Sequence, residues 1–114
     1  MTSLLQSVSD DVMILDFEQT KILHQDAVDN IGNELQNIAR TTDLKKVIVD
    51  MNRIELMTSS MIGQFVSFHK QCQARGINVT FCNLTSQIKE LFKITKLDTM
   101  FQIKNTREDA MKSL

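Results

Sequence analysis

Two kinds of apolar pattern alternate along this chain, helical repeats and short continuous runs. Between 26 and 40, apolar residues recur every three or four positions, which predicts one face of a helix ending near Arg40. This face comprises Val28, Ile31, Leu35 and Ile38. A short apolar run at 12–17 precedes the helix, and the segment 44–51, with three β-branched residues in a row, follows it. That segment favours a central strand covered on both faces over an alternating edge strand.

A second helical pattern begins near residue 59 and ends at Arg75-Gly76, where a cationic last turn is followed by the residue best suited to a helix C-terminus. The predicted inner face of this helix comprises Ile62, Phe65, Val66, His69 and Cys72. Phe68 falls outside that face and lies seven positions after Met61. These two residues are candidates for one exposed apolar patch, with isolated surface residues as the alternative.

The remaining segments continue the alternation of strand and helix. A hairpin is expected around Asp10-Asp11, and further strands at 77–81 and 101–103 are each followed by a capped helix, starting near Thr85 and Thr106. The order β-β-α-β-α-β-α-β-α predicts an α/β fold with a largely parallel sheet and an antiparallel N-terminal hairpin. At 114 residues we expect a single domain over 1–114.

Composition narrows the range of functions. With a net charge of −1 and neither Trp nor Tyr, the chain has no basic field and few stacking platforms, so we expect no nucleic-acid partner. The first eleven residues show no basic start and no long apolar run, so we expect a cytoplasmic protein that does not enter a membrane.

The residue types that carry chemistry are sparse. Cys72 and Cys82 have neither metal-ligand nor redox spacing and are expected to be small core residues. His69 is expected at the core or its boundary, and neither it nor His24 lies near a nucleophile in sequence. We therefore expect no catalytic residue, no metal site and no cofactor.

Three consecutive hydroxyls mark the most informative point in the sequence. After the strand at 44–51 and a loop at 52–57, Thr58, Ser59 and Ser60 stand where the second helix begins. A helix N-terminus presents unpaired N–H groups and a partial positive charge. A hydroxyl there either caps the helix or accepts a phosphate, and both readings hold together if Thr58 caps while Ser59 stays exposed.

Several segments in this order resemble the STAS domain, the family of bacterial anti-sigma factor antagonists and of the cytoplasmic tails of sulfate transporters. The segments that carry the resemblance are 46–51, Ile54 with 56–60, His69-Lys70, 74–76 and 94–101. The resemblance covers nearly the whole chain. It implies a STAS-like mixed, largely parallel sheet with helices packed against it, and a regulatory protein rather than an enzyme.

The resemblance also implies roles for the hydroxyls. Family members that act as switches carry Asp-Ser-Ser-Gly at this turn, and a partner serine kinase that is also the anti-sigma factor phosphorylates the first serine. Ser59 matches that serine, with Thr58 as the reserve acceptor. Thr58 replaces the family's Asp and Met61 its Gly. The implied partner-binding residues are Thr58, Ser59, Ser60 and Met61, and the implied partners are the anti-sigma factor/serine kinase or another signalling protein, and a serine phosphatase.

Two alternatives remain open from the sequence. The chain could be a STAS interaction or scaffold module that is not phosphorylated, in which Thr58 and Ser59 only cap the helix and Met61 contacts a partner. It could also be a small α/β enzyme that binds a phosphorylated ligand at the same helix N-terminus. The enzyme hypothesis has little support, because the turn has no Gly-rich loop and no nucleotide-binding Lys.

Overall fold

A five-stranded sheet forms the centre of the computed structural model, which describes residues 4–114. The strands lie in the order β1-β2-β4-β6-β7; β1 and β2 form an antiparallel hairpin, and all other neighbours are parallel. The bounds are Leu4–Ser9 for β1, Val12–Phe17 for β2, Lys46–Asp50 for β4, Asn78–Cys82 for β6 and Gln102–Lys104 for β7. The predicted α/β fold, largely parallel with an N-terminal hairpin, is confirmed.

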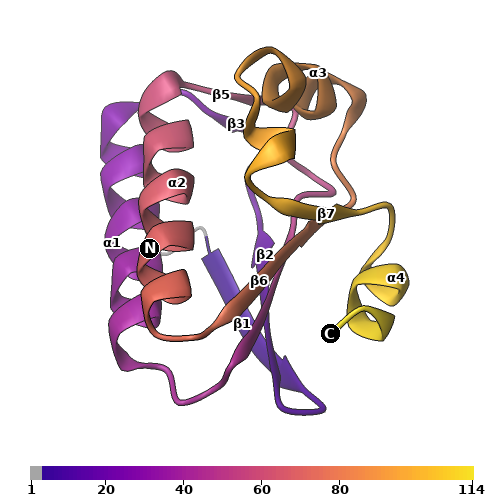
Figure 1. Cartoon of the computed structure of the whole chain (residues 1–114). Coiled ribbons are helices and arrows are strands. Elements are labelled where there is room, and N and C mark those ends of the chain that lie inside the picture. The colour runs from indigo at the N-terminus through magenta and orange to yellow at the C-terminus, as the bar shows by residue number, and fades with distance from the viewer. Residues whose placement is uncertain (1–3) are drawn as a thin grey trace.

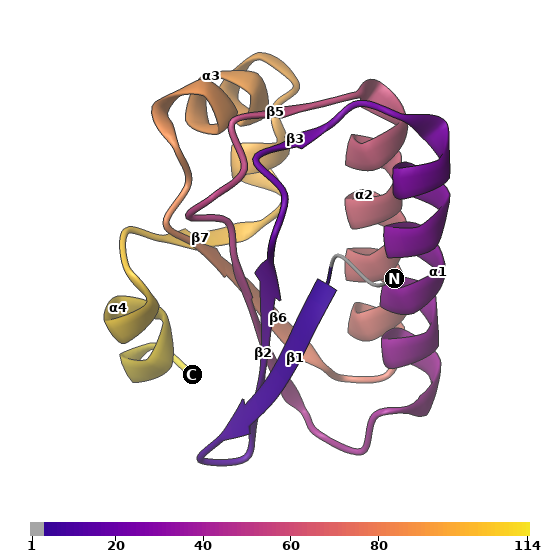
Figure 2. The same ribbon diagram turned by 180° about the vertical axis from the view of Figure 1, so that it is seen from behind.

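Helices cover the two faces of this sheet unequally. The long helices α1 (Gln25–Thr41) and α2 (Ser59–Ala74) pack side by side on one face, and the short α4 (Arg107–Lys112) lies on the other (Figures 1 and 2). Helix α3 (Ser86–Ile94) and the 3-10 turn η1 (Leu97–Thr99) lie near one end of the sheet. No helix within residues 4–114 is both long and apolar enough to cross a bilayer.

The main core lies between the sheet and the α1–α2 layer. Phe65 of α2 stands at its centre, with its ring edge-on to Phe17 at 5.9 Å and to Phe81 at 5.8 Å between centroids. Phe81 in turn stacks on Phe101 at 4.4 Å, which ties η1 and β7 to the same core. Such ring pairs stabilise a core beyond the apolar area they bury. These contacts fix α2, and therefore its first turn, against the sheet.

The inner face of α2 differs from the predicted one. Met61, Phe65, Phe68 and Cys72 are fully buried, whereas Ile62, Val66 and His69 are only partly buried. Both sets follow helical spacing, so periodicity alone could not choose between them. Because α2 packs against both the sheet and α1, its buried stripe is rotated toward Met61 and Phe68. The expected exposed patch of Met61 and Phe68 is wrong.

A second, two-stranded sheet was not predicted. It consists of β3 (Lys21–Ile22) and β5 (Leu56–Met57), which pair in parallel beyond the end of the main sheet (Figure 1). Each strand has two residues, which is too short for any periodic signal. This small sheet carries the chain directly into α2 and so places the hydroxyl turn.

Candidate functional site

The turn between β5 and α2 is held by Thr58. Its backbone N–H donates to the carbonyl of Ile22 at 3.2 Å, which ties the turn to β3. Its side-chain Oγ1 accepts a hydrogen bond from the Met61 N–H at 3.2 Å, and its backbone is extended, as an N-cap requires. Thr58 is therefore the cap of α2, and its hydroxyl is committed to a structural contact.

Ser59 and Ser60 follow the cap and face solvent. Both side chains are exposed, and neither hydroxyl is hydrogen-bonded within residues 4–114. As first-turn residues their backbone N–H groups have no acceptor inside the helix. The first turn of α2 also contains no acidic residue, so no carboxylate of that turn competes for the positive helix end. An anion attached to Ser59 would meet a favourable field without breaking an existing contact.

The inner side of the same turn is apolar and closed. Met61 is fully buried and Met57 is 9 % exposed, so these two side chains anchor the turn on the core. Met61 belongs to the predicted partner-binding set, and that assignment is corrected here because its side chain has no exposed surface to offer. Met61 occupies the first buried position of the helix. The outward surface of the turn is therefore formed by Thr58, Ser59 and Ser60.

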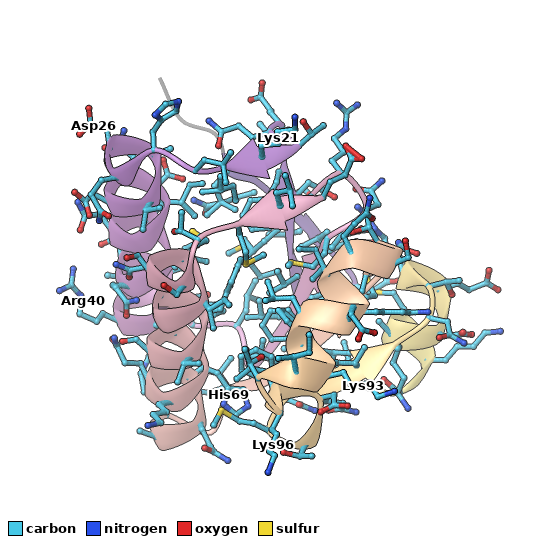
Figure 3. All side chains as sticks on the ribbon, turned by 90° about the horizontal axis from the view of Figure 1, so that it is seen from above. Lys21, Asp26, Arg40, His69, Lys93 and Lys96 are labelled. Carbon is cyan, nitrogen blue, oxygen red and sulfur yellow. The ribbon has the colours of Figure 1, made fainter. Side chains whose placement is uncertain are left out.

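Exposed apolar residues gather near the turn. Leu56 of β5 is 46 % exposed and Ile94, the last residue of α3, is 70 % exposed. Both line a groove of about 270 Å³ between β5 and α3, whose charged lining residues are Glu55 and Glu90. Figure 3, seen from above, places the β3–β5 sheet beside the start of α2 and next to α3. The turn thus borders a surface with both apolar and acidic character.

A partly buried ionic cluster joins α4 to the sheet, on the face opposite α1 and α2. Asp50, which is 2 % exposed, accepts hydrogen bonds from Arg107 Nε at 2.9 Å and from Asn83 Nδ2 at 3.1 Å, and Arg107 also contacts the Asp16 carboxylate. Burial raises the pKa of Asp16, with Arg107 opposing the shift. Sequence reasoning missed this cluster, because its members are far apart in the chain and no spacing links them. It fastens α4 to the sheet.

The cysteines and histidines of the described part of the chain lie apart from the hydroxyl turn and serve the core. Within residues 4–114 no three His, Cys, Asp or Glu side chains are grouped to hold a metal ion. Cys72 and Cys82 are buried and unpaired, as predicted, and burial raises the pKa of their thiols to about 11 and about 12. His69 lies at the predicted core boundary, with its ring 5.1 Å from that of Phe101, and burial lowers its pKa.

Known proteins share this architecture. An anti-sigma-factor antagonist (STAS) domain protein from Planctomyces limnophilus matches with a TM-score of 0.87 at 17% identity, over 99% of this chain and 98% of that one. An anti-sigma factor antagonist from Mycobacterium paratuberculosis matches with a TM-score of 0.85 at 13% identity, over 96% and 91%. The Bacillus cell fate determinant SpoIIAA, in its phosphorylated form, matches with a TM-score of 0.72 at 16% identity, over 96% and 97%.

These likenesses establish a common fold at low identity. The family itself follows from the sequence, because the profile of the STAS domain matches residues 5–110, which is most of the chain. The match spans the main sheet apart from the first residue of β1, and it includes the β5–α2 turn. This chain belongs to the STAS domain family.

Proposed function

We propose that this chain is a regulatory protein-binding module that acts as an anti-sigma factor antagonist. In this proposal it binds an anti-sigma factor that is also a serine kinase, and phosphorylation of Ser59 ends the complex. A serine phosphatase would restore the binding form. The chain itself performs no catalysis in this scheme, and any nucleotide would bind to the partner kinase.

The observation that carries the proposal is that Thr58 caps α2 while the Ser59 hydroxyl makes no structural contact. Thr58 caps α2, so Ser59 is left exposed, unbonded and at the positive end of the helix. A phosphate on Ser59 would therefore replace no structural contact. The neighbouring N–H groups and the helix dipole would stabilise its negative charge.

Release of the partner follows from charge and desolvation. A phosphoserine carries roughly −1.5 to −2 charges, and burying that charge against a partner surface without compensation is costly. A protein docked closely over Ser59 would be expelled, while the fold beneath it would stay the same. In this scheme the switch needs no conformational change in the chain.

The surface beside Ser59 supports a protein as the partner. Leu56 and Ile94 expose apolar area next to the turn, and the groove between β5 and α3 adds a concave surface. Exposed apolar patches with a polar rim are typical of protein interfaces. SpoIIAA, which shares this fold, has been observed in both unphosphorylated and phosphorylated forms, which agrees with a switch on such a domain.

Mapping the phosphate in the cell of origin tests the proposal. The tagged chain would be isolated with phosphatase inhibitors, and its phosphorylation sites located by mass spectrometry, for the wild type and for Ser59→Ala. Ser86 provides an internal comparison, because it is also exposed and also follows a capping Thr, Thr85, at the start of a helix. In the wild type we expect phosphate on Ser59 and none on Ser86. In the Ser59→Ala variant we expect no phosphate at this turn.

Other outcomes are equally informative. Phosphate on Thr58 instead of Ser59 would contradict the assigned acceptor, since Thr58 would have to give up its cap contact. A chain that retains a partner but carries no phosphate at this turn would be an interaction module without the switch, and the proposal in its present form would fail.

A further inference from the structure

The two edges of the main sheet are protected very differently. Edge strand β7 has three residues, contains Lys104 and leads into α4. Edge strand β1 has six residues, pairs residue by residue with β2 without a bulge, and contains neither a charged residue nor Pro. Its Leu5 and Val8 side chains are 47 % and 60 % exposed.

An unprotected edge strand is a template for another strand. Natural sheets guard their edges with charges, prolines, bulges or a covering element, because the outward backbone N–H and C=O groups can pair with a further chain. From Leu5 to Ser9 every side chain of β1 is exposed, and Figure 2 shows β1 as the outermost strand, with no helix beyond it. None of the usual protections is present over this stretch.

The charges next to β1 indicate what can pair with it. Asp10 and Asp11 form the hairpin turn at its C-terminal end and are both exposed. Two β1 strands in parallel would bring these carboxylates side by side. In an antiparallel pair the two turns lie at opposite ends, on the order of 20 Å apart, which exceeds the Debye length of about 8 Å at physiological salt. The uncharged strand is therefore complementary to itself in the antiparallel direction.

We propose that β1 pairs with β1 of a second copy of this chain, forming a two-fold symmetric dimer with one continuous sheet. Such pairing uses the outward backbone groups of both strands and covers Leu5 and Val8 in part. The outer strands of the joined sheet are then the two β7 strands, which are short and carry Lys104. Growth stops at two copies for that reason.

The proposed interface is separate from the Ser59 turn. The β1–β2 turn and the β3–β5 sheet lie at opposite ends of the molecule (Figure 1), so the dimer would present both Ser59 turns to partners. A single six-residue strand contact lies at the low end of interface sizes, below about 1,200 Å² in total. We therefore expect association in the micromolar to millimolar range rather than a permanent dimer. The inference does not depend on phosphorylation.

Sedimentation equilibrium from about 20 μM to about 1 mM tests the dimer, a range chosen for a weak interface. The weight-average mass of the wild type should rise from 13.1 kDa toward twice that value. The double variant Leu5→Lys/Val8→Lys, which charges the edge, should stay at the monomer mass. Leu23→Lys is the matched control, because Leu23 is 48 % exposed but lies outside β1, and it should associate like the wild type. Circular dichroism confirms that each variant is folded.

Hydrogen exchange locates the interface independently of these variants. Amide exchange within residues 5–9 of the wild type should slow as concentration rises, while exchange at β7 should stay unchanged. The proposal is overturned by a wild type that remains monomeric at 1 mM, by association that persists in the double variant, by open-ended aggregates in place of dimers, or by unchanged exchange in β1.

Discussion

At the residue scale, Thr58 and Ser59 differ in what they contribute to stability. Because Thr58 Oγ1 accepts from the Met61 N–H, Thr58→Ala should lower the free energy of unfolding by about 1 kcal/mol, within the usual 0.5–2 range for a lost N-cap. Ser59→Ala should change the free energy of unfolding by less than about 0.5 kcal/mol, as expected for an exposed site without such a contact. Urea unfolding measures both. A loss in Ser59→Ala as large as in Thr58→Ala would mean that Ser59 shares the cap.

Lys96 carries backbone strain that a single substitution should relieve. It has φ 62° and ψ 21° just after the end of α3, where the left-handed conformation favours Gly, and its side chain projects away from the body of the molecule (Figure 3). Lys96→Gly should raise the free energy of unfolding by about 0.5–1 kcal/mol. Lys89→Gly, inside the same helix, should lower it by up to about 1 kcal/mol. Thermal unfolding of both variants checks the contrast, and equal destabilisation would exclude the strain.

At the scale of elements, an ion pair adds to the apolar contacts that hold α4 on the sheet. Arg107 joins α4 to the buried Asp50 of β4, whereas Lys112 of the same helix pairs only with Glu108 at the surface, at 3.3 Å. Arg107→Leu should lower the free energy of unfolding by about 1–3 kcal/mol. This loss is smaller than for breaking a fully buried ion pair, because the Arg107 side chain is 40 % exposed. Lys112→Leu should change stability by less than about 0.5 kcal/mol. Urea unfolding compares the two, and a neutral Arg107→Leu would show that α4 is held by its apolar contacts alone.

The same cluster should make stability depend on pH. Burial raises the pKa of Asp16 above its ordinary value of 3.8, so the folded chain holds this proton more tightly than the unfolded one. The stabilisation from Asp16 is complete below about pH 4 and is lost as pH rises through the raised pKa. The stability of Asp16→Asn relative to the wild type should therefore increase from about pH 4 to pH 7. Urea unfolding at several pH values measures this trend; the opposite trend would mean that the pairing with Arg107 dominates.

At the scale of the whole molecule, the sequence determined the strands and helices more clearly than their contacts. Apolar runs and helix caps predict the order of the main elements, and the three hydroxyls predict the start of α2. Helical spacing could not decide whether Ile62 or Met61 faces the core, because the rotation of α2 depends on its packing against both α1 and the sheet. The β3–β5 sheet and the Asp50–Arg107 contact join residues distant in sequence, and neither leaves a periodic trace.

In the proposed function a partner docks over Ser59, and negative charge at that position ends the contact. The direct measurement is the amount of partner retained from an extract of the cell of origin by three immobilised forms: wild type, Ser59→Asp, and Gln73→Glu. Gln73 is exposed near the other end of α2, so Gln73→Glu adds the same charge to the same helix far from the turn. Ser59→Asp should stay folded, because an acidic residue suits a helix N-terminus.

We expect one protein with kinase activity to be retained by the wild type and Gln73→Glu, and to be lost from Ser59→Asp by a factor of about ten or more, which corresponds to about 1.4 kcal/mol in binding. Equal retention by wild type and Ser59→Asp would contradict the account, and so would equal loss from both charged variants.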